Sequence, residues 1–343
     1  VSLIWYLENV FYRSFGTVYD YIQQNIFEGE HIQNDIINIG FWPGGDRDGN
    51  PFVTPEITLK VASRLRQTII KNYYRDLRQL KRKVTFAGVE DRVNALEAEM
   101  YKMSTNKKTY LTLDQLVSEL KEIKSEIVQK HESLYAPDVN SLLNKIHLFG
   151  FHFSSLDIRQ DSRVHAKVFN DMVNVLIKSG SSIFPNNYHG LTEAEQIAIL
   201  SKVEGCLNME LISEKETLKA LETMAAIKAI QKANGEKAAN RYIISNNQTT
   251  LNVMQLYAML KLVAFEKELT VDIAPLSETI IDLQNAPSVM EELYTNPNYA
   301  AHLKARANRQ TIMLGFSDGT KDGGYLMANW AIYQAKEYLT TIS

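Results

Sequence analysis

The chain has 343 residues, of which 45% are hydrophobic and 22% charged, with a formal net charge of -3 at pH 7. These values predict a globular protein with enough apolar residues for one large core or two ordinary ones. The small negative charge provides no broad basic field, which argues against nucleic acid as a partner. The single cysteine, Cys206, excludes an internal disulfide framework and is typical of a cytoplasmic protein. No run reaches the ~18 apolar residues of a membrane-spanning helix, so we expect no membrane association.

The first predicted element is a helix from Val1 to Gln24, and it begins without an initiator methionine, a basic leader or a cleavage site. From this start we expect the chain to be a piece of a longer protein.

Helical periodicity dominates the chain. A long amphipathic helix is predicted after Thr54-Pro55-Glu56, because threonine can cap, proline suits the first turn and glutamate complements the positive helix end. Amphipathic runs over 89–103 and 113–131 predict an antiparallel helical pair. Further helices are predicted after the capping pair Thr192 and Glu195, and over 218–233 before the turn at Asn234-Gly235.

Short apolar runs between the helices predict about five strands, at 36–41, 151–158, 242–245, 271–275 and 312–316. Tens of helical residues separate them, so they must pair in parallel through crossover helices. We therefore expect a predominantly helical α/β fold, either an α/β barrel or a doubly wound sheet, with function at the carboxyl ends of the strands. No linker marks a domain boundary. We expect one continuous unit over residues 1–343, with a helical excursion over about 55–147.

The first strand leads into the loop GGDRDGN, where glycines permit tight turns and polar side chains crowd together. Asp46, Arg47, Asp48 and Asn50 are therefore candidate site residues. An alternative is a corner held by its own hydrogen bonds, in which the aspartates accept from backbone N–H groups and from Arg47. The sequence leaves both interpretations open. The spacing also resembles part of a calcium loop, but the downstream ligands are missing.

The second run ends in LDIRQDSR and places Arg159 just beyond a strand. Arginine suits a phosphate, because its planar fork binds two oxygens and keeps its charge when partly buried. The alternative is a strand-end ion pair with Asp157 or Asp161. His165, near the start of the following helix, is the one histidine that we retain as a supporting candidate.

Two carboxylates, Glu278 and Asp318, follow the fourth and fifth runs and can converge at neighbouring strand ends. Magnesium prefers such oxygen ligands, with water and substrate completing its coordination. Lys321, in a glycine-rich turn, could bring a positive charge to an anion beside the metal. The alternative is a turn held by Asp318 and Asp322 with Lys321 exposed.

Five segments together, GFWPGGDRDGNPFVTPE, LDIRQDS, RYIIS, APLSETIIDLQNAPSVM and LGFSDGTKDGGYLMANW, resemble phosphoenolpyruvate carboxylase in order and spacing. The resemblance spans nearly the whole chain, which corresponds to about the middle third of that enzyme. It implies part of an α/β (TIM-like) barrel with long surrounding helices, in a cytoplasmic enzyme that is commonly a homotetramer.

The resemblance further implies conversion of phosphoenolpyruvate and bicarbonate to oxaloacetate and phosphate with Mg²⁺ or Mn²⁺ and without biotin. At matching positions, Glu278 and Asp318 correspond to metal ligands, Arg159 to a phosphate-binding group and Lys321 to an active-site cation. The loop from Asp46 to Asn50 is expected near the substrate.

This sequence departs from the family pattern by Ser277 in place of the usual phenylalanine and by SDGTKDGG in place of SDSxKDAG. The family's TxHPT and FHGRGG segments, which carry histidines and arginines of the active site, do not occur in it. We therefore expect the chain alone to lack carboxylase activity. The rival hypothesis is a non-catalytic helical scaffold that binds phosphorylated ligands or a partner protein.

Overall fold

The computed structural model describes residues 2–27 and 37–343, so Val1 and Ile36, the first residues of two predicted elements, lie outside the described residues. Contacts group the chain into two compact units. Unit 1 contains the described residues of Val1–Gly40 together with Lys60–Ser155, and unit 2 contains Phe41–Leu59 and Leu156–Ser343. Sequence analysis predicts one unit with a helical excursion over about 55–147, and most of that excursion lies in unit 1.

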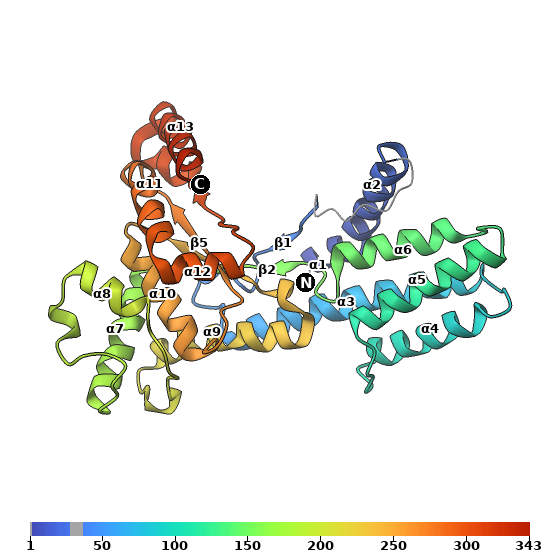
Figure 1. Ribbon diagram of the computed structural model, residues 1–343, viewed down its shortest axis with the longest axis horizontal. Helices are drawn as coiled ribbons and strands as arrows, with labels where there is room; N and C mark the ends of the chain where they lie inside the picture. Colours follow the sequence, from blue (N-terminus) through green and yellow to red (C-terminus); the bar gives the residue numbers. More distant parts are fainter. Residues whose placement is uncertain (1, 28–36) are drawn as a thin grey trace. The chain divides into compact units, whose positions relative to one another are not determined.

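Unit 1 is helical (Figure 1). Its N-terminal segment is α-helical at both ends with a π-helical turn between. Contacts join α2 to α6, α4 to α5 and α5 to α6. Its helices are α1 (Ser2–Tyr6), the π-helix η1 (Leu7–Phe11), α2 (Tyr12–Asn25), α3 (Pro55–Lys81, whose first residues belong to unit 2), α4 (Glu90–Ser104), α5 (Leu113–Lys130) and α6 (Ala136–Phe149).

The predicted helical pair of unit 1 is confirmed as α4 and α5. Thr112 begins α5 with a capping box, in which its side chain accepts from the N–H of Gln115 and the Gln115 side chain accepts from the N–H of Thr112. Arg92, near the start of α4, donates to Glu119 and Glu122 of α5. The predicted helix after Thr54 is confirmed as α3, which begins at Pro55 and buries its apolar face.

Unit 2 is built on a parallel sheet whose strand order is β3-β4-β5-β6. The register aligns Arg159 with Ile243, Ile243 with Ala274, and Ser277 with Leu314. A second, two-stranded sheet consists of β1 and β2. The strands are β1 (Gly40–Phe41), β2 (Ser155–Leu156), β3 (Ile158–Asp161), β4 (Arg241–Ser245), β5 (Asp272–Ser277) and β6 (Met313–Leu314).

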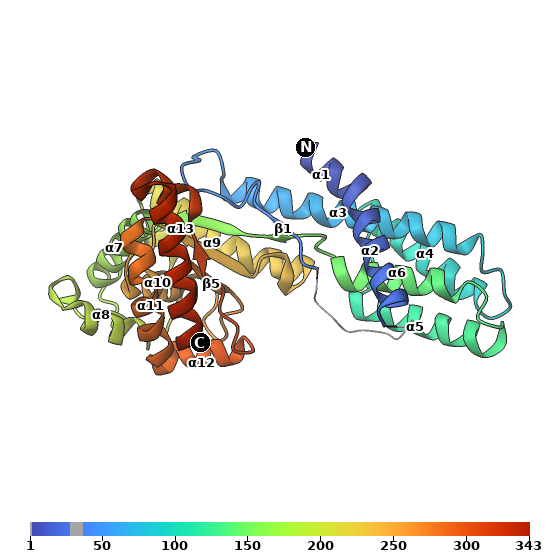
Figure 2. The same ribbon diagram turned by 90° about the horizontal axis from the view of Figure 1, so that it is seen from above.

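Each strand of the four-stranded sheet leads into a helix within the next few residues, so the carboxyl ends of the strands and the amino ends of the helices gather at one edge. Helix α10 contacts α7, α8, α9 and α11, and α11 contacts α13 (Figure 2). The helices are α7 (Ser162–Lys178), α8 (Glu193–Leu200), α9 (Lys215–Asn234), α10 (Thr250–Val263), α11 (Ile280–Thr295), α12 (Pro297–Ala305) and α13 (Phe316–Ile342).

The predicted α/β class, the helical majority and the short parallel strands are confirmed. Several strand boundaries differ from the prediction. Of the run 36–41, only Gly40–Phe41 forms a strand among the described residues, and the run 271–275 is found as Asp272–Ser277. The run 151–158 is divided, since Phe153 turns with φ of 69° and the chain then forms β2 and β3, so Arg159 lies within a strand instead of beyond it. The run 312–316 keeps only Met313 and Leu314 in the sheet, and the glycine-rich segment after it is helical. Within the described residues, no helix is long and apolar enough to cross a membrane.

Candidate active site

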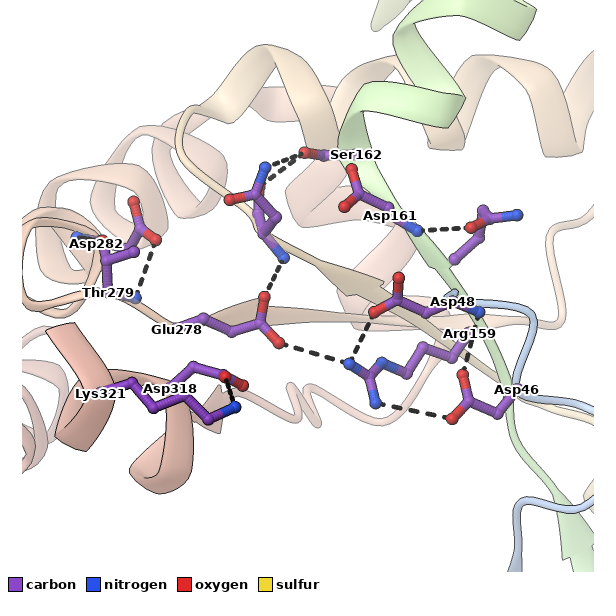
Figure 3. A network of polar contacts seen from close by, with 12 residues as sticks. Asp46, Asp48, Arg159, Asp161, Ser162, Glu278, Thr279, Asp282, Asp318 and Lys321 are labelled. Atoms are coloured by element: carbon purple, nitrogen blue, oxygen red, sulfur yellow. Dashed lines mark hydrogen bonds and ion pairs between the residues drawn. The ribbon is translucent and has the colours of Figure 1, made fainter. Parts of the chain in front are cut away.

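A single guanidinium gathers three carboxylates at the carboxyl edge of the sheet (Figure 3). Arg159 Nη2 lies 2.8 Å from Asp48 Oδ2 and 3.4 Å from Glu278 Oε1, and Arg159 Nη1 lies 3.6 Å from Asp46 Oδ2. The four side chains are partly buried, with exposed fractions of 15–29%. Segments more than a hundred residues apart in sequence therefore converge on Arg159.

Backbone contacts hold the glycine-rich loop against strand β3. The N–H of Arg159 donates to Gly45 O at 3.1 Å, and the N–H of Arg47 donates to Arg159 O at 2.9 Å. The approach is so close that a Cβ on Gly45 would lie 2.0 Å from Asp157 O. Only glycine fits there, and this contact fixes where Asp46 is presented.

An aromatic ring lies beneath the Arg159 guanidinium. The guanidinium carbon is 5.3 Å from the centre of a Trp42 ring, a distance typical of cation–π contact. Trp42 Nε1 in turn donates to Asp157 Oδ2 at 3.0 Å. Burial raises the pKa of Asp157, while Arg241 and the indole N–H favour its charged form. Trp42 also packs against the buried face formed by Ile243, Ala274 and Leu276.

Glu278, the first residue after β5, is held from two sides. Its Oε1 faces Arg159, and its Oε2 accepts the backbone N–H of Asn246 at 2.9 Å. Burial raises the pKa of Glu278; the Asn246 N–H and Arg159 oppose this shift, whereas the charges of Asp318 and Asp48 add to it. The glutamate therefore lies within electrostatic reach of both aspartates.

Asp318 lies in the first turn of α13, where a negative charge complements the positive end of the helix. Lys321, one turn further, is 2.6 Å from Asp318 Oδ1 and its side chain is 76% exposed. Gly315 and Gly319 let this turn pack on Glu278, since a Cβ on either would lie 3.0–3.3 Å from backbone atoms of that residue. The predicted glycine-rich turn is therefore the start of a helix, α13, which begins at Phe316 directly after Gly315 in extended conformation.

Two carboxylates at neighbouring strand ends, Glu278 and Asp318, are oxygen donors of the kind that a hard divalent cation prefers. They follow the adjacent strands β5 and β6. The carboxylates of the site, Asp46, Asp48, Glu278 and Asp318, outnumber its cations, Arg159 and Lys321, so the site has a net negative charge. Magnesium needs only one or two protein carboxylates, with water and substrate as its other ligands. Among the residues that the structure describes, no group of three or more His, Cys, Asp or Glu side chains could hold a metal ion.

Two of the predicted site residues point elsewhere. Arg47 donates to Val53 O at 3.1 Å and to Thr223 Oγ1 at 2.7 Å, so its guanidinium ties the loop to α9. Asn50 Oδ1 accepts the N–H of Phe52 at 3.1 Å. Their participation in substrate binding stays a prediction.

The alternatives weighed from sequence are partly realised. Asp46 does accept the N–H of Asp48, as expected for a corner held by its own hydrogen bonds. Arg159, however, pairs with neither candidate from its own strand end, because Asp157 bonds to Trp42 and Asp161 to Arg163. For the third segment the alternative was a turn held by Asp318 and Asp322 with Lys321 exposed. Lys321 is indeed exposed, and Asp322 accepts the backbone N–H of Ile280.

His165 is 1% exposed, and its Nε2 lies 3.0 Å from the hydroxyl of Tyr242. Its pKa is lowered to about 3, chiefly by burial; the charge of Asp161 opposes this shift and that of Arg47 adds to it. The ring is therefore neutral at pH 7 and packs between α7 and β4.

Sequence reasoning missed Trp42 and Asn246. Trp42 directly precedes the glycine-rich loop, and an aromatic residue beside loop glycines would have been a usable signal. Asn246 acts through its main chain, and no residue pattern signals that a backbone N–H meets a glutamate 32 residues later.

Comparison with known proteins agrees with this architecture. A family model described as phosphoenolpyruvate carboxylase matches residues 3–102 and 87–343. The chain is 28% identical over 380 residues to the phosphoenolpyruvate carboxylase of Nitrosomonas eutropha, covering 96% of this chain and 40% of that protein. It is 27% identical over 352 residues to that of Corynebacterium diphtheriae, covering 88% of this chain and 38% of the relative.

An α/β chain whose charged side chains gather at the carboxyl edge of a parallel sheet has its candidate site where α/β enzymes bind their ligands. The chain belongs to the phosphoenolpyruvate carboxylase family. It spans about 40% of the length of the curated relatives that it matches.

Proposed function

We propose that this chain supplies part of the phosphate and metal site of an enzyme that converts phosphoenolpyruvate and bicarbonate to oxaloacetate and phosphate. The observation that supports this most directly is the convergence of Asp46, Asp48 and Glu278 on Arg159 at the carboxyl edge of the sheet. That edge is where open α/β sheets and α/β barrels bind substrates.

Arg159 is the proposed phosphate-binding and catalytic residue. Its guanidinium is partly buried and stacked over Trp42, so it keeps a fixed plane with which two phosphate oxygens can pair. The carboxylates of Asp48 and Glu278 pair with the guanidinium. Substrate phosphate would replace part of this pairing. The loop from Asp46 to Asn50, Arg47 included, is the proposed wall of the substrate site.

Glu278 and Asp318 are the proposed ligands of a divalent cation, Mg²⁺ or Mn²⁺. When bound, such an ion supplies a Lewis acid that stabilises negative charge on phosphate and enolate oxygens. Lys321 is the proposed catalytic cation beside them. It now pairs with Asp318, so its ammonium would become available to a substrate anion once that carboxylate is engaged elsewhere.

The proposed reaction proceeds in two stages without biotin. An oxygen of bicarbonate attacks the phosphorus, and the bond from phosphorus to the enol oxygen breaks, which gives carboxyphosphate and the enolate of pyruvate. Carboxyphosphate then releases carbon dioxide and phosphate, and the enolate carbon bonds to the carbon dioxide to form oxaloacetate. Arg159 would hold the phosphoryl oxygens through both stages, with its planar fork paired to two of them.

For the whole protein we propose a cytoplasmic homotetramer in which the parallel sheet of unit 2 is one part of a TIM-like barrel. The four strands β3 to β6 pair in sequence order, as successive strands of such a barrel do.

Calorimetric titration of the chain with Mn²⁺ tests the metal site. Glu278→Ala and Asp318→Ala should each weaken Mn²⁺ binding at least about tenfold, since even outer residues around a metal contribute about 10–100-fold. Asp272→Asn is the matched control, because Asp272 is the first residue of β5 and lies at the opposite end of that strand from Glu278. Unchanged affinity in both alanine variants would instead support the scaffold hypothesis.

A further inference from the structure

The turn after strand β4 has an uncommon backbone conformation. Asn246 has φ of 51°, in the left-handed region that asparagine tolerates better than most residues but that still carries a cost. Its N–H donates to Glu278 Oε2 at 2.9 Å, and its carbonyl accepts the hydroxyl of Ser162 at 2.6 Å. Both backbone polar groups of Asn246, its N–H and its carbonyl, are therefore hydrogen-bonded.

Ser162 is well placed to maintain that conformation. It is 3% exposed, begins α7 directly after β3, and also accepts the side-chain amide of Asn246 at 3.4 Å. The next residue is anchored as well, since the N–H of Asn247 donates to Leu276 O at 3.1 Å. The turn thus connects β3, β4 and β5 at the edge where the site lies.

The conformation of Asn246 decides how Glu278 presents its two oxygens. With the Asn246 N–H on Oε2, the other oxygen, Oε1, faces Arg159. If the turn relaxed to negative φ at Asn246, the peptide planes on both sides of its Cα would have to reorient. The N–H of Asn246 would then leave Oε2, and the glutamate would lose one of its two fixed contacts. The carboxylate could then turn fully onto Arg159, with which it would form a closer pair.

We propose that Ser162 is a positioning residue for Glu278 and that it acts through the backbone of Asn246. The hydroxyl holds Asn246 in the left-handed conformation, the Asn246 N–H holds Oε2, and the carboxylate keeps the orientation required of a metal ligand. This inference rests on the proposed function for the metal-ligand role of Glu278. The hydrogen-bond chain itself does not depend on that role.

The test compares Ser162→Ala with Ser201→Ala in the 343-residue chain. Ser201 is the matched control, because it is 4% exposed, donates to Ala198 O and accepts the side-chain amide of Asn298 at 3.5 Å, as Ser162 does with Asn246. Each variant loses one buried hydroxyl of the same kind. Only Ser162 is connected to Glu278.

Two measurements are made on each variant: amide hydrogen exchange at Asn246 and Mn²⁺ affinity by calorimetry. Ser162→Ala should speed exchange at Asn246 roughly fivefold, as expected for the loss of one supporting hydrogen bond. It should also weaken Mn²⁺ binding about tenfold or more, the effect of removing an outer support of a metal ligand. Ser201→Ala should change neither quantity. Equal effects of the two variants, or no effect of Ser162→Ala on exchange, would overturn the proposal.

Asn246→Gly supplies a second test, because glycine adopts positive φ without help from a neighbour. In the Asn246→Gly background, Ser162→Ala should weaken Mn²⁺ binding less than it does alone. Additive losses would refute the claim that the serine acts through the conformation of residue 246. Ser162→Cys, which keeps the volume but donates weakly, replaces the alanine variant if that one does not fold.

The exchange measurement separates this proposal from the proposed function. If the unmodified chain binds no Mn²⁺, the metal site fails, and exchange at Asn246 alone decides the role of Ser162. If Mn²⁺ binds and depends on Glu278 but Ser162→Ala leaves exchange unchanged, the proposed function stands and the positioning role fails.

Discussion

Arg159 Nη2 and Glu278 Oε1 lie 3.4 Å apart, although 119 residues separate them in sequence. One residue lies within β3 and the other directly follows β5, and β4 lies between these strands in the sheet. The pair is possible because parallel strands bring their carboxyl ends to one edge.

Replacing Arg159 with alanine should destabilise the chain. The change leaves Asp46, Asp48 and Glu278 partly buried without their shared cation, and an unsatisfied buried polar group costs roughly 1–3 kcal/mol. The free energy of unfolding in urea at pH 7 is the measurement. Arg163→Ala is the control, because the Arg163 side chain is 78% exposed and its removal should change the free energy of unfolding much less. Equal losses in the two variants would contradict the central role of Arg159.

The free energy of unfolding should depend on pH through Glu278. Its pKa is raised by burial in the folded chain, so the folded state keeps this proton at a higher pH than the unfolded state does. The contribution is therefore unfavourable at pH 7 and disappears as pH falls through the raised pKa toward the ordinary value of 4.5. Glu278→Gln should be more stable than the unmodified chain at pH 7, with an advantage that shrinks toward pH 4.5.

Urea unfolding of both chains from pH 4 to pH 7.5 measures this difference, with the exposed Glu266→Gln as the control. An advantage of Glu278→Gln that grows on acidification would contradict the assigned sign.

Mn²⁺ at about 100 times its Kd should stabilise the unmodified chain by about 2.7 kcal/mol at pH 7, and it should stabilise Glu278→Gln less.

Gly45→Ala should disrupt the loop that carries Asp46 and Asp48. The added Cβ would lie 2.0 Å from Asp157 O, which belongs to the backbone and cannot turn aside as a side chain could. We expect a loss of about 1–3 kcal/mol or more in the free energy of unfolding, as for overpacked sites. Gly190→Ala, where no atom lies within 4 Å of the new Cβ, should stay within about 0.5 kcal/mol. A neutral Gly45→Ala would show that the loop is held less closely.

The chain alone should form no oxaloacetate from phosphoenolpyruvate and bicarbonate with Mg²⁺ or Mn²⁺. Its 343 residues contain neither a TxHPT nor an FHGRGG segment, which in the resembled enzyme supply further histidines and arginines of the active site. A coupled assay that reduces oxaloacetate with NADH measures the product, and an intact phosphoenolpyruvate carboxylase serves as the positive control. The Arg159→Ala variant gives the background rate. Oxaloacetate formation by the unmodified chain above that background would refute the prediction.

Local patterns were enough to predict most of the secondary structure. The capping signals at Thr54 and Thr192 and the apolar periodicity that follows Pro55 depend on neighbours within a few residues, so the sequence alone predicts α3 and α8. The predicted strand before Arg159 was less accurate, because Phe153 turns with φ of 69°, a conformation that an apolar run gives no reason to expect.

The sequence by itself determined the α/β class, several of the helices, the approximate positions of the strands and the set of acidic and basic residues that could meet at strand ends. The tertiary structure alone decided that Arg159 pairs with Asp48 and Glu278, that Arg47 turns toward α9, and that the Asn246 N–H holds Glu278. The physical reason is the distance along the sequence over which each effect acts. Propensity and periodicity act over a few residues, whereas a salt bridge or a backbone hydrogen bond between strands depends on the register and crossover connections of the whole sheet.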